Sequence, residues 1–121
     1  MATVELTAEN LESAVSGEGL LLIDFWAAWC GPCRMFGPVF GRVSGKHSGT
    51  VFGKVDTGAQ PELAAAFGIS SIPTLMVIRD KVMLYAQPGA LPEQALEQLI
   101  ARAREIDMDE VRKTLAQPAA S

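Results

Sequence analysis

Hydrophobic and polar positions change their spacing along this chain, and each spacing predicts an element. The run from Leu20 to Trp26 is almost continuously apolar, which is typical of a strand covered by helices on both faces. From Pro32 onward the apolar positions recur every three or four residues, so we expect a helix with proline in its first turn. The apolar stripe of this helix is Met35, Phe36, Val39, Phe40 and Val43. The centre of the chain is therefore predicted to be a buried strand, a short loop and a helix.

The rest of the pattern predicts further strands and helices. We expect strands at residues 3–6, 50–55, 74–79 and 82–86, and helices at 7–15, at 61–67 and from 92 onward. Thr7 is expected to cap the first of these helices and Gly68 to end the second. The last two strands flank Asp80-Lys81, as in a hairpin, although this turn lacks the glycine that tight hairpins prefer. The predicted class is α/β, with a mixed central β-sheet sandwiched between α-helices.

The helix after Pro32 contains residues that helices normally avoid. Pro38 removes a backbone hydrogen bond and should kink the axis, at a cost of about 3 kcal/mol unless packing compensates. Gly37, Gly41 and Gly45 recur every four residues, and each costs roughly 1 kcal/mol relative to alanine. We expect that these glycines allow close packing and that the helix frays at its end.

Composition and charge narrow the class of protein. The 121 residues are 49% hydrophobic and 20% charged, as in a globular domain. A net charge of -4 predicts no overall electrostatic attraction to nucleic acid or an anionic membrane, and no apolar run reaches the roughly 18 to 20 residues that span a bilayer. The N-terminus also lacks the pattern of a signal peptide. We therefore expect a cytoplasmic protein with neither nucleic acid nor membrane as a partner.

Cys30 and Cys33 are the two cysteines of the chain. A disulfide between them would close too short a loop to stabilise the fold much, and the cytosol would keep it reduced. Zinc would need about four ligands, whereas the chain adds only His47, which we expect to be a solvated loop residue. At a helix start, however, positions three apart lie about 5 to 6 Å from each other, so dithiol and disulfide interconvert with little movement. The spacing predicts a redox pair and no metal site.

The positions of the two cysteines and of Asp24 within these elements predict their chemical roles. The partial positive charge at the helix start should stabilise a thiolate on Cys30, the candidate nucleophile. Cys33 should be less exposed, as suits a resolving thiol that attacks a mixed disulfide. Asp24 lies inside the apolar strand, where burial should raise its pKa and let it exchange a proton with Cys33. The alternative for Asp24 is a strand-end carboxylate that reaches solvent.

The sequence resembles thioredoxins at these positions. Residues 23–34, Ile-Asp-Phe-Trp-Ala-Ala-Trp-Cys-Gly-Pro-Cys-Arg, resemble the family's active-site strand and loop, and Ile72-Pro73-Thr74 resembles its cis-proline loop. The resemblance covers roughly residues 3 to 105 and implies the thioredoxin fold. It implies a general protein disulfide reductase with no bound cofactor, whose redox centre is the Cys30–Cys33 couple. Its implied partners are oxidised proteins and thioredoxin reductase, an NADPH-linked flavoprotein, and we expect a monomer.

The resemblance also implies roles for single residues. Cys30 would attack the substrate disulfide and Cys33 would resolve it, while Asp24 matches the family's buried acid and Lys54 a lysine near that acid. An apolar patch would dock an extended substrate segment around the sulfurs, with Pro73 in cis. The residues that match this patch are Trp29, Gly31, Pro32, Ile72, Pro73, Gly89 and Ala90. Ala28 stands where bacterial members commonly carry an acid, so we expect a different partner preference.

A second interpretation is a non-catalytic binding subunit with the thioredoxin fold. The apolar patch would then dock a partner, and the two cysteines would be incidental. The intact Cys30-Gly31-Pro32-Cys33 motif together with Asp24 favours the reductase.

The chain continues beyond the part that resembles thioredoxins. Asp107 provides an acidic N-cap with Glu110 three residues later, and apolar residues follow at helical spacing. We therefore divide the chain into a thioredoxin domain at 1–106 and a C-terminal helical extension and tail at 107–121. Residues 118–121 should fray. A helix of roughly ten residues is marginal in water, so we expect it to pack on its own domain rather than on a second copy or a partner.

Overall fold

The computed structural model describes residues 2–116. Its strands are β1 (Thr3–Glu5), β2 (Leu20–Trp26), β3 (Val51–Asp56), β4 (Thr74–Arg79) and β5 (Val82–Pro88). Its helices are α1 (Leu11–Ser16), α2 (Gly31–Ser44), α3 (Pro61–Ala66), α4 (Glu93–Glu105) and α5 (Met108–Ala116). The strands form one sheet in the order β1-β3-β2-β4-β5. β3 is parallel to β1 and β2, whereas β4 is antiparallel to β2 and β5, so the predicted mixed sheet is confirmed.

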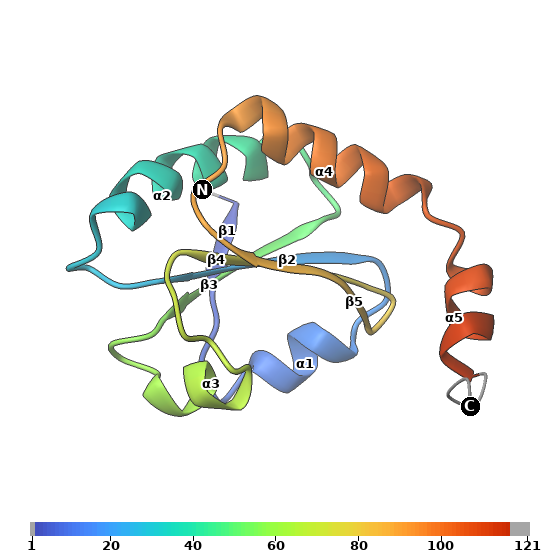
Figure 1. The fold of residues 1–121 in the computed structure, drawn as a ribbon, viewed down its shortest axis with the longest axis horizontal. Helices are drawn as coiled ribbons and strands as arrows, with labels where there is room; N and C mark the ends of the chain where they lie inside the picture. The colour runs from blue at the N-terminus through green and yellow to red at the C-terminus, as the bar shows by residue number, and fades with distance from the viewer. Residues whose placement is uncertain (1, 117–121) are drawn as a thin grey trace.

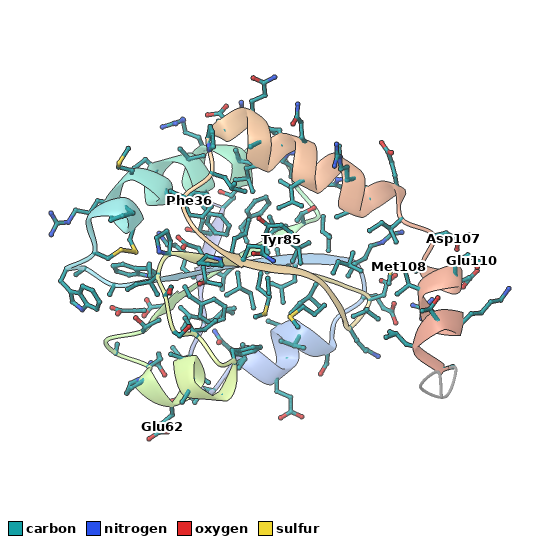
Figure 2. All side chains as sticks on the ribbon, viewed as in Figure 1. Phe36, Glu62, Tyr85, Asp107, Met108 and Glu110 are labelled. Atoms are coloured by element: carbon teal, nitrogen blue, oxygen red, sulfur yellow. A yellow bond between two sulfur atoms is a disulfide. The ribbon has the colours of Figure 1, made fainter. Side chains whose placement is uncertain are left out.

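Helices cover both faces of this sheet. Figure 1 shows α2 and α4 on one face and α1 and α3 on the other. Phe36 and Phe40 of α2 pack with Phe52 of β3 in the first of the two cores, and Figure 2 shows side chains filling both layers. Phe25 and Leu63 belong to the second core. β2 lies in the middle of the sheet with six of its seven residues buried, which explains its continuous apolar run.

The first helix starts later than the pattern predicts. Residues 8–10 form turns, and α1 begins at Leu11. The Asn10 side chain accepts a hydrogen bond from the Thr7 N–H at 2.7 Å and donates one to the Glu5 carbonyl at 2.9 Å. These bonds stabilise a turn between β1 and α1, so the prediction that Thr7 caps the helix is wrong.

The predicted hairpin between β4 and β5 is confirmed. Asp80 and Lys81 both have left-handed backbone conformations, with φ of 49° and 72°. A side chain compensates for the absence of glycine, because Asp80 Oδ1 accepts a hydrogen bond from the Gly19 N–H at 2.7 Å. The Asp80 N–H donates in return to the Gly19 carbonyl at 2.9 Å, which ties the turn to the start of β2.

Helix α2 runs from Gly31 to Ser44 and includes Pro38 as one continuous element. Two of its glycines do not serve close packing. A Cβ on Gly41 would meet nothing within 4 Å, and a Cβ on Gly37 would meet only Lys54 Nζ, at 3.5 Å. The prediction of close packing is therefore wrong at both positions, which instead border an open groove.

Gly53, in β3, is a glycine that packing does require. A Cβ at this position would lie 2.8 Å from Leu6 Cγ, and the Leu6 side chain is itself buried in the core. We expect Gly53→Ala to lower the free energy of unfolding by about 1 to 3 kcal/mol, as overpacked cores do. Urea denaturation would measure this change. Gly41→Ala is the matched control, and an equal loss in both variants would contradict the explanation.

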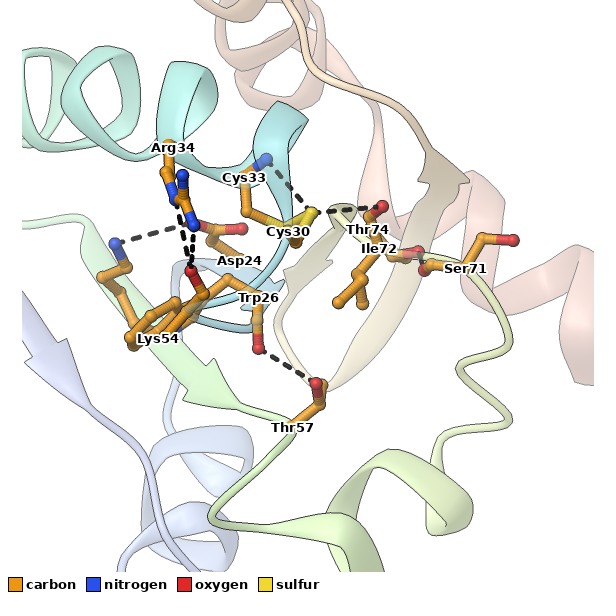
Figure 3. The surroundings of a disulfide bond; sticks show 11 residues. Asp24, Trp26, Cys30, Cys33, Arg34, Lys54, Thr57, Ser71, Ile72 and Thr74 are labelled. Carbon is orange, nitrogen blue, oxygen red and sulfur yellow. Dashed lines mark hydrogen bonds and ion pairs between the residues drawn. A yellow bond between two sulfur atoms is a disulfide. The ribbon is translucent and has the colours of Figure 1, made fainter.

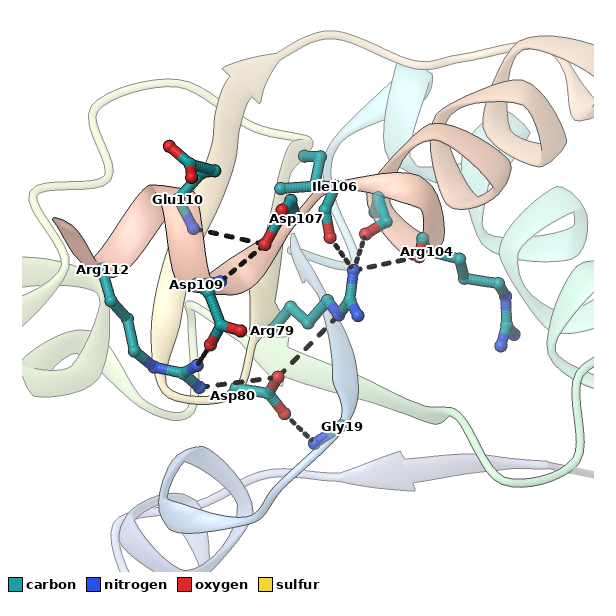
Figure 4. Close-up of polar contacts among 10 residues, drawn as sticks. Gly19, Arg79, Asp80, Arg104, Ile106, Asp107, Asp109, Glu110 and Arg112 are labelled. Atoms are coloured by element: carbon teal, nitrogen blue, oxygen red, sulfur yellow. Dashed lines mark hydrogen bonds and ion pairs between the residues drawn. The ribbon is translucent and has the colours of Figure 1, made fainter. Parts of the chain in front are cut away.

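Helix α5 is attached to the end of the sheet opposite the loop that precedes α2 (Figure 1). Met108 is buried, and Asp107 Oδ1 accepts hydrogen bonds from the N–H groups of Asp109 and Glu110. Figure 4 shows Arg112 reaching Asp80 in the hairpin turn, at 3.7 Å. The prediction of a second short helix is confirmed, with contacts to its own domain. The predicted fraying of 118–121 lies outside the described residues.

The division of the chain at residue 106 stays a prediction, which a truncation tests. Ending the chain after Ile106 removes the buried Met108 and the Arg112–Asp80 ion pair. The shortened chain keeps the hydrogen bonds that Arg79 Nη1 donates to the carbonyls of Ala103, Arg104 and Ile106. We expect a loss of about 1 to 2 kcal/mol and a Tm lower by roughly 5 to 10 °C.

Thermal unfolding monitored by circular dichroism would measure this change. A chain ending after Ala116 is the control, because it keeps α5. Disulfide-reductase activity per folded molecule should survive in both chains. Loss of activity in a folded chain that ends after Ile106 would assign α5 a role in docking.

Candidate functional site

The two cysteines lie at the junction between β2 and α2. Cys30 is the N-cap of α2, and Cys33 lies in its first turn (Figure 3). They form a disulfide, with Cα atoms 5.2 Å apart. The Cys30 N–H donates to the Ala27 carbonyl at 3.2 Å, so a tight turn joins the strand to the helix. The sequence motif thus gives a disulfide at a helix N-terminus, as predicted.

The two sulfur atoms differ in their surroundings rather than in exposure. Cys30 is 5% exposed and Cys33 4%, so the expected difference in exposure is absent in this disulfide form. Cys30 Sγ accepts a hydrogen bond from the Cys33 N–H at 3.2 Å and lies 3.7 Å from the Ile72 carbonyl oxygen. A backbone N–H at a helix start stabilises negative charge, which on reduction would favour a thiolate at Cys30.

Asp24 is a fully buried carboxylate below the disulfide. Neither of its oxygens has a hydrogen-bond partner, and Oδ2 lies 3.7 Å from Lys54 Nζ. Burial raises the pKa of Asp24 to about 6, and the nearby Lys54 ammonium partly opposes this rise. Figure 3 shows the carboxylate between Lys54 and the cysteine pair. The alternative of a strand-end aspartate that reaches solvent is therefore wrong.

Lys54 is held in place from two sides. It is the register partner of Asp24 on the neighbouring strand β3, which explains why their side chains meet. Its ammonium also lies 5.2 Å from the centre of the Trp26 ring, at cation–π distance. The structure thus brings Lys54 to the acid, as the resemblance implies.

An apolar surface surrounds the mouth of the disulfide. Trp29 is 74% exposed, and it lines the same shallow pocket as Ile72. The Ile72–Pro73 peptide bond is cis, as expected. The Gly89 N–H donates to the Pro73 carbonyl at 2.8 Å, which ties the loop after β5 to the cis-proline loop. Gly31, Pro32, Gly89 and Ala90 are exposed as well, whereas Ile72 is half-buried and Pro73 is buried beneath the surface that it was expected to form. We call these residues, with Trp29, the docking patch.

The sequence pattern misplaces one residue and misses another. Met35, predicted in the apolar stripe, is 73% exposed on α2. Arg34 was not predicted to have a role, yet its Nε and Nη2 both donate to the Ala28 carbonyl, at 3.2 and 3.1 Å. The guanidinium therefore holds the loop before Cys30. Only its place one residue after Cys33 could have pointed to it.

The other candidate groups lie away from this site. His47 is in the loop after α2, but its ring is not simply solvated, because Nε2 lies 2.6 Å from Glu97 Oε1. Within residues 2–116, no three His, Cys, Asp or Glu side chains gather where they could hold a metal ion. No helix in that part of the chain is long and apolar enough to cross a membrane.

The sequence and structure of the chain were compared with those of known proteins to identify its family. The Thioredoxin family model matches residues 2–102, which include the cysteine pair, Asp24 and the cis-proline loop. The chain belongs to the thioredoxin family. Like other thioredoxins, it is a thiol–disulfide oxidoreductase that uses its own redox-active disulfide, Cys30–Cys33, without an external cofactor.

Individual thioredoxins agree with this assignment. The chain is 60% identical over 116 residues to "Putative thioredoxin 2" of Streptomyces coelicolor, a match that covers 96% of this chain and 87% of the relative. It is 40% identical to the thioredoxin of Alicyclobacillus acidocaldarius, over 83% of this chain and 96% of the relative. The crystal structure of Malassezia sympodialis thioredoxin superposes with a TM-score of 0.73 at 32% identity, covering 84% of this chain and 91% of that one.

These findings separate the two interpretations of the sequence. A thioredoxin whose two cysteines lie within disulfide distance is a redox protein, so the non-catalytic binding subunit is not supported. The match to the Streptomyces coelicolor relative is long enough to include α5, whereas the family model ends before it. The sequence that forms α5 in this chain is therefore part of that match.

Proposed function

We propose that this thioredoxin is a general cytoplasmic reductase of protein disulfides, that thioredoxin reductase reduces it again, and that Cys30 is its nucleophile. The observation that carries the proposal is the Cys33 N–H directed at Cys30 Sγ, next in sequence to the exposed Trp29 of the docking patch. A thiolate formed there is stabilised by the start of α2 and faces an arriving disulfide.

The reaction of the reduced protein has two exchange steps. The Cys30 thiolate attacks one sulfur of the substrate disulfide, forms a mixed disulfide and releases the other substrate sulfur as a thiolate. The Cys33 thiol then loses its proton and attacks Cys30 Sγ, which re-forms the Cys30–Cys33 disulfide and releases the second substrate thiolate. The protein thereby passes two electrons to the substrate, and each released thiolate takes up a proton.

Asp24 is the group we propose to accept the proton of Cys33. A carboxylate with a pKa of about 6 is mostly ionised at neutral pH and is still basic enough to take a proton, directly or through a water molecule. Lys54 is proposed to tune this acid, because its ammonium stabilises the ionised form.

The remaining parts of the proposal concern partners and location. The docking patch is proposed to bind an extended segment on either side of the target disulfide, since Trp29 is exposed next to Cys30 and the Ile72 carbonyl oxygen lies 3.7 Å from Cys30 Sγ. The working unit is proposed to be a monomer, in which the cysteine pair, Asp24 and Lys54 act together. Thioredoxins generally work with thioredoxin reductase, an NADPH-linked flavoprotein, and the bacterial relatives support a cytoplasmic role here.

A coupled assay tests the proposal. Thioredoxin reductase from the same organism, NADPH and insulin are mixed with catalytic amounts of the protein, and NADPH oxidation is followed by absorbance. We expect oxidation that requires the protein, and none with Cys30→Ser. A protein that dithiothreitol reduces but that the reductase does not would contradict the proposed electron donor.

A further inference from the structure

A groove runs along α2 on the far side of the cysteine pair from the docking patch. Its volume is about 560 Å³, and the residues that matter for it are Cys33, Arg34, Gly37, Gly41, Arg42 and Lys54. We call it the α2 groove. It shares no lining residue with the pocket between Trp29 and Ile72. The α2 groove is thus a second surface that reaches the redox centre.

Gly37 and Gly41 of α2 keep this groove open. The space above Gly41 is empty to 4 Å, and above Gly37 only the end of Lys54 comes near. Each glycine weakens the helix by roughly 1 kcal/mol relative to alanine, and no packing contact requires either of them. The open space above Gly41 can take an apolar side chain of a partner, and Gly37 adds room beside it that is bounded by the end of Lys54.

The groove carries positive charge on a protein whose net charge is -4. Three cations, Arg34, Arg42 and Lys54, line it, and no acidic side chain does so in the described part of the chain. Lys54 faces the buried Asp24, and Arg42 shares Glu93 with Lys46. The three lining cations therefore face two carboxylates, Asp24 and Glu93, and Glu93 is shared with Lys46, so the charge along the groove is positive.

Arg34 is the cation best placed to meet a partner. Its two hydrogen bonds go to a neutral carbonyl, that of Ala28, and within residues 2–116 no carboxylate lies within 4.0 Å of it. Its charge is therefore uncompensated, while its position beside Cys33 is fixed. A fixed, unpaired cation next to an apolar hollow is complementary to an acidic residue beside an apolar one.

We propose that the α2 groove docks a segment of the partner protein that carries an acidic side chain next to an apolar one, close to the target disulfide. The acidic group meets Arg34, and the apolar group lies over Gly37 and Gly41. This inference rests on the proposed function and adds a substrate preference to it: disulfides with acidic and apolar neighbours are reduced faster than disulfides with neutral polar neighbours.

Two synthetic peptides with the same disulfide test the proposal. One carries Glu-Phe on both sides of the disulfide and the other Gln-Phe, so that only charge differs. Each is mixed with the reduced protein, and the rate constant is measured from the change in tryptophan fluorescence. We expect the Glu peptide to react at least about threefold faster at low salt, and the difference to shrink at about 0.5 M salt.

Substitutions then separate the effect of the Arg34 charge on the peptide rates from the effect of the open space above Gly41. Arg34→Gln should abolish the preference for the Glu peptide, whereas Arg102→Gln, on the exposed surface of α4, should keep it. Gly41→Met fills the groove and should slow both peptides about threefold or more, whereas Gly41→Ala leaves it open and should not. Hydroxyethyl disulfide is too small to reach the groove, so its rate should be the same in the wild type and in the Gly41 and Arg102 variants. The effect of Arg34→Gln is judged from the ratio of the two peptide rates, because Arg34 also holds the loop before Cys30.

The outcomes distinguish this inference from the proposed function. Equal rates for the two peptides with the wild-type protein would overturn the inference, as would equal peptide rates for Gly41→Met and Gly41→Ala. Arg34→Gln gives an independent result if the methionine variant does not fold. A wild-type protein that fails to reduce hydroxyethyl disulfide would overturn the proposed function and this inference with it.

Discussion

Replacing Cys33 by serine is expected to leave the protein covalently bound to its substrates. Cys30 can still attack a disulfide, but no thiol is left at position 33 to release the mixed disulfide. Serine is close to cysteine in size, and the Cys33 N–H that faces Cys30 Sγ belongs to the backbone and is unaffected. We expect turnover to fall to background, with one substrate molecule bound per protein.

Non-reducing gel electrophoresis and mass spectrometry of the reduced variant mixed with an oxidised protein would detect this complex. Cys30→Ser is the matched control, since it keeps one thiol and loses the proposed nucleophile. Complexes that accumulate with Cys30→Ser rather than Cys33→Ser would reverse the two roles. Faster alkylation of Cys33 than of Cys30 near neutral pH would contradict them as well.

Asp24→Asn is expected to raise the free energy of unfolding of the protein and to lower its rate of turnover. The pKa of Asp24 rises from 3.8 to about 6 on folding, because burial disfavours the charged carboxylate. Each pKa unit corresponds to about 1.4 kcal/mol, so above pH 6 the charge costs the folded state about 3 kcal/mol. An amide removes this cost, but it cannot accept the proton of Cys33. We expect turnover at pH 7 to fall roughly tenfold or more.

The pH dependence gives the sharper test. Between pH 4 and pH 6 the folded wild type keeps the proton of Asp24 while the unfolded chain has lost it, so stability falls as pH rises through this range. Below pH 4 both states are protonated, and the cost disappears. The free energies of unfolding of wild type and Asp24→Asn should therefore converge at pH 4 and diverge toward pH 7.

Urea denaturation of the oxidised proteins at several pH values would measure this difference. Asp109→Asn is the control, since Asp109 is exposed on α5 and its loss should change stability by less than about 0.5 kcal/mol at any pH. Equal turnover of wild type and Asp24→Asn across neutral pH would remove Asp24 from the mechanism.

Local sequence patterns predicted the elements whose formation depends on residues near each other in the chain. The continuous apolar run of β2, the proline at the start of α2 and the Asp107 cap of α5 each correspond to an element in the structure. The start of α1 was misplaced because the Asn10 side chain forms hydrogen bonds to two backbone groups, and this bonding competes with helix formation. Periodicity does not report such bonds.

In the candidate site, too, local sequence predicted some features and not others. The cysteine spacing and the buried strand were enough to predict a redox pair and an acid beneath it. The pairing of Lys54 with Asp24 follows from the register of β2 and β3, and was available only through the resemblance to thioredoxins. The α2 groove escaped prediction because a glycine that leaves space open and one that permits close contact look identical in a sequence.

The position of α5 has a practical consequence. Because this helix is attached at the end of the sheet remote from the disulfide, a linker joined beyond it would lead away from the docking patch and the α2 groove (Figure 1). The protein can then be immobilised on a bead through its C-terminal side with its cysteines facing the solution. With serine at position 33, such beads would collect mixed disulfides from a cell extract and release them with dithiothreitol.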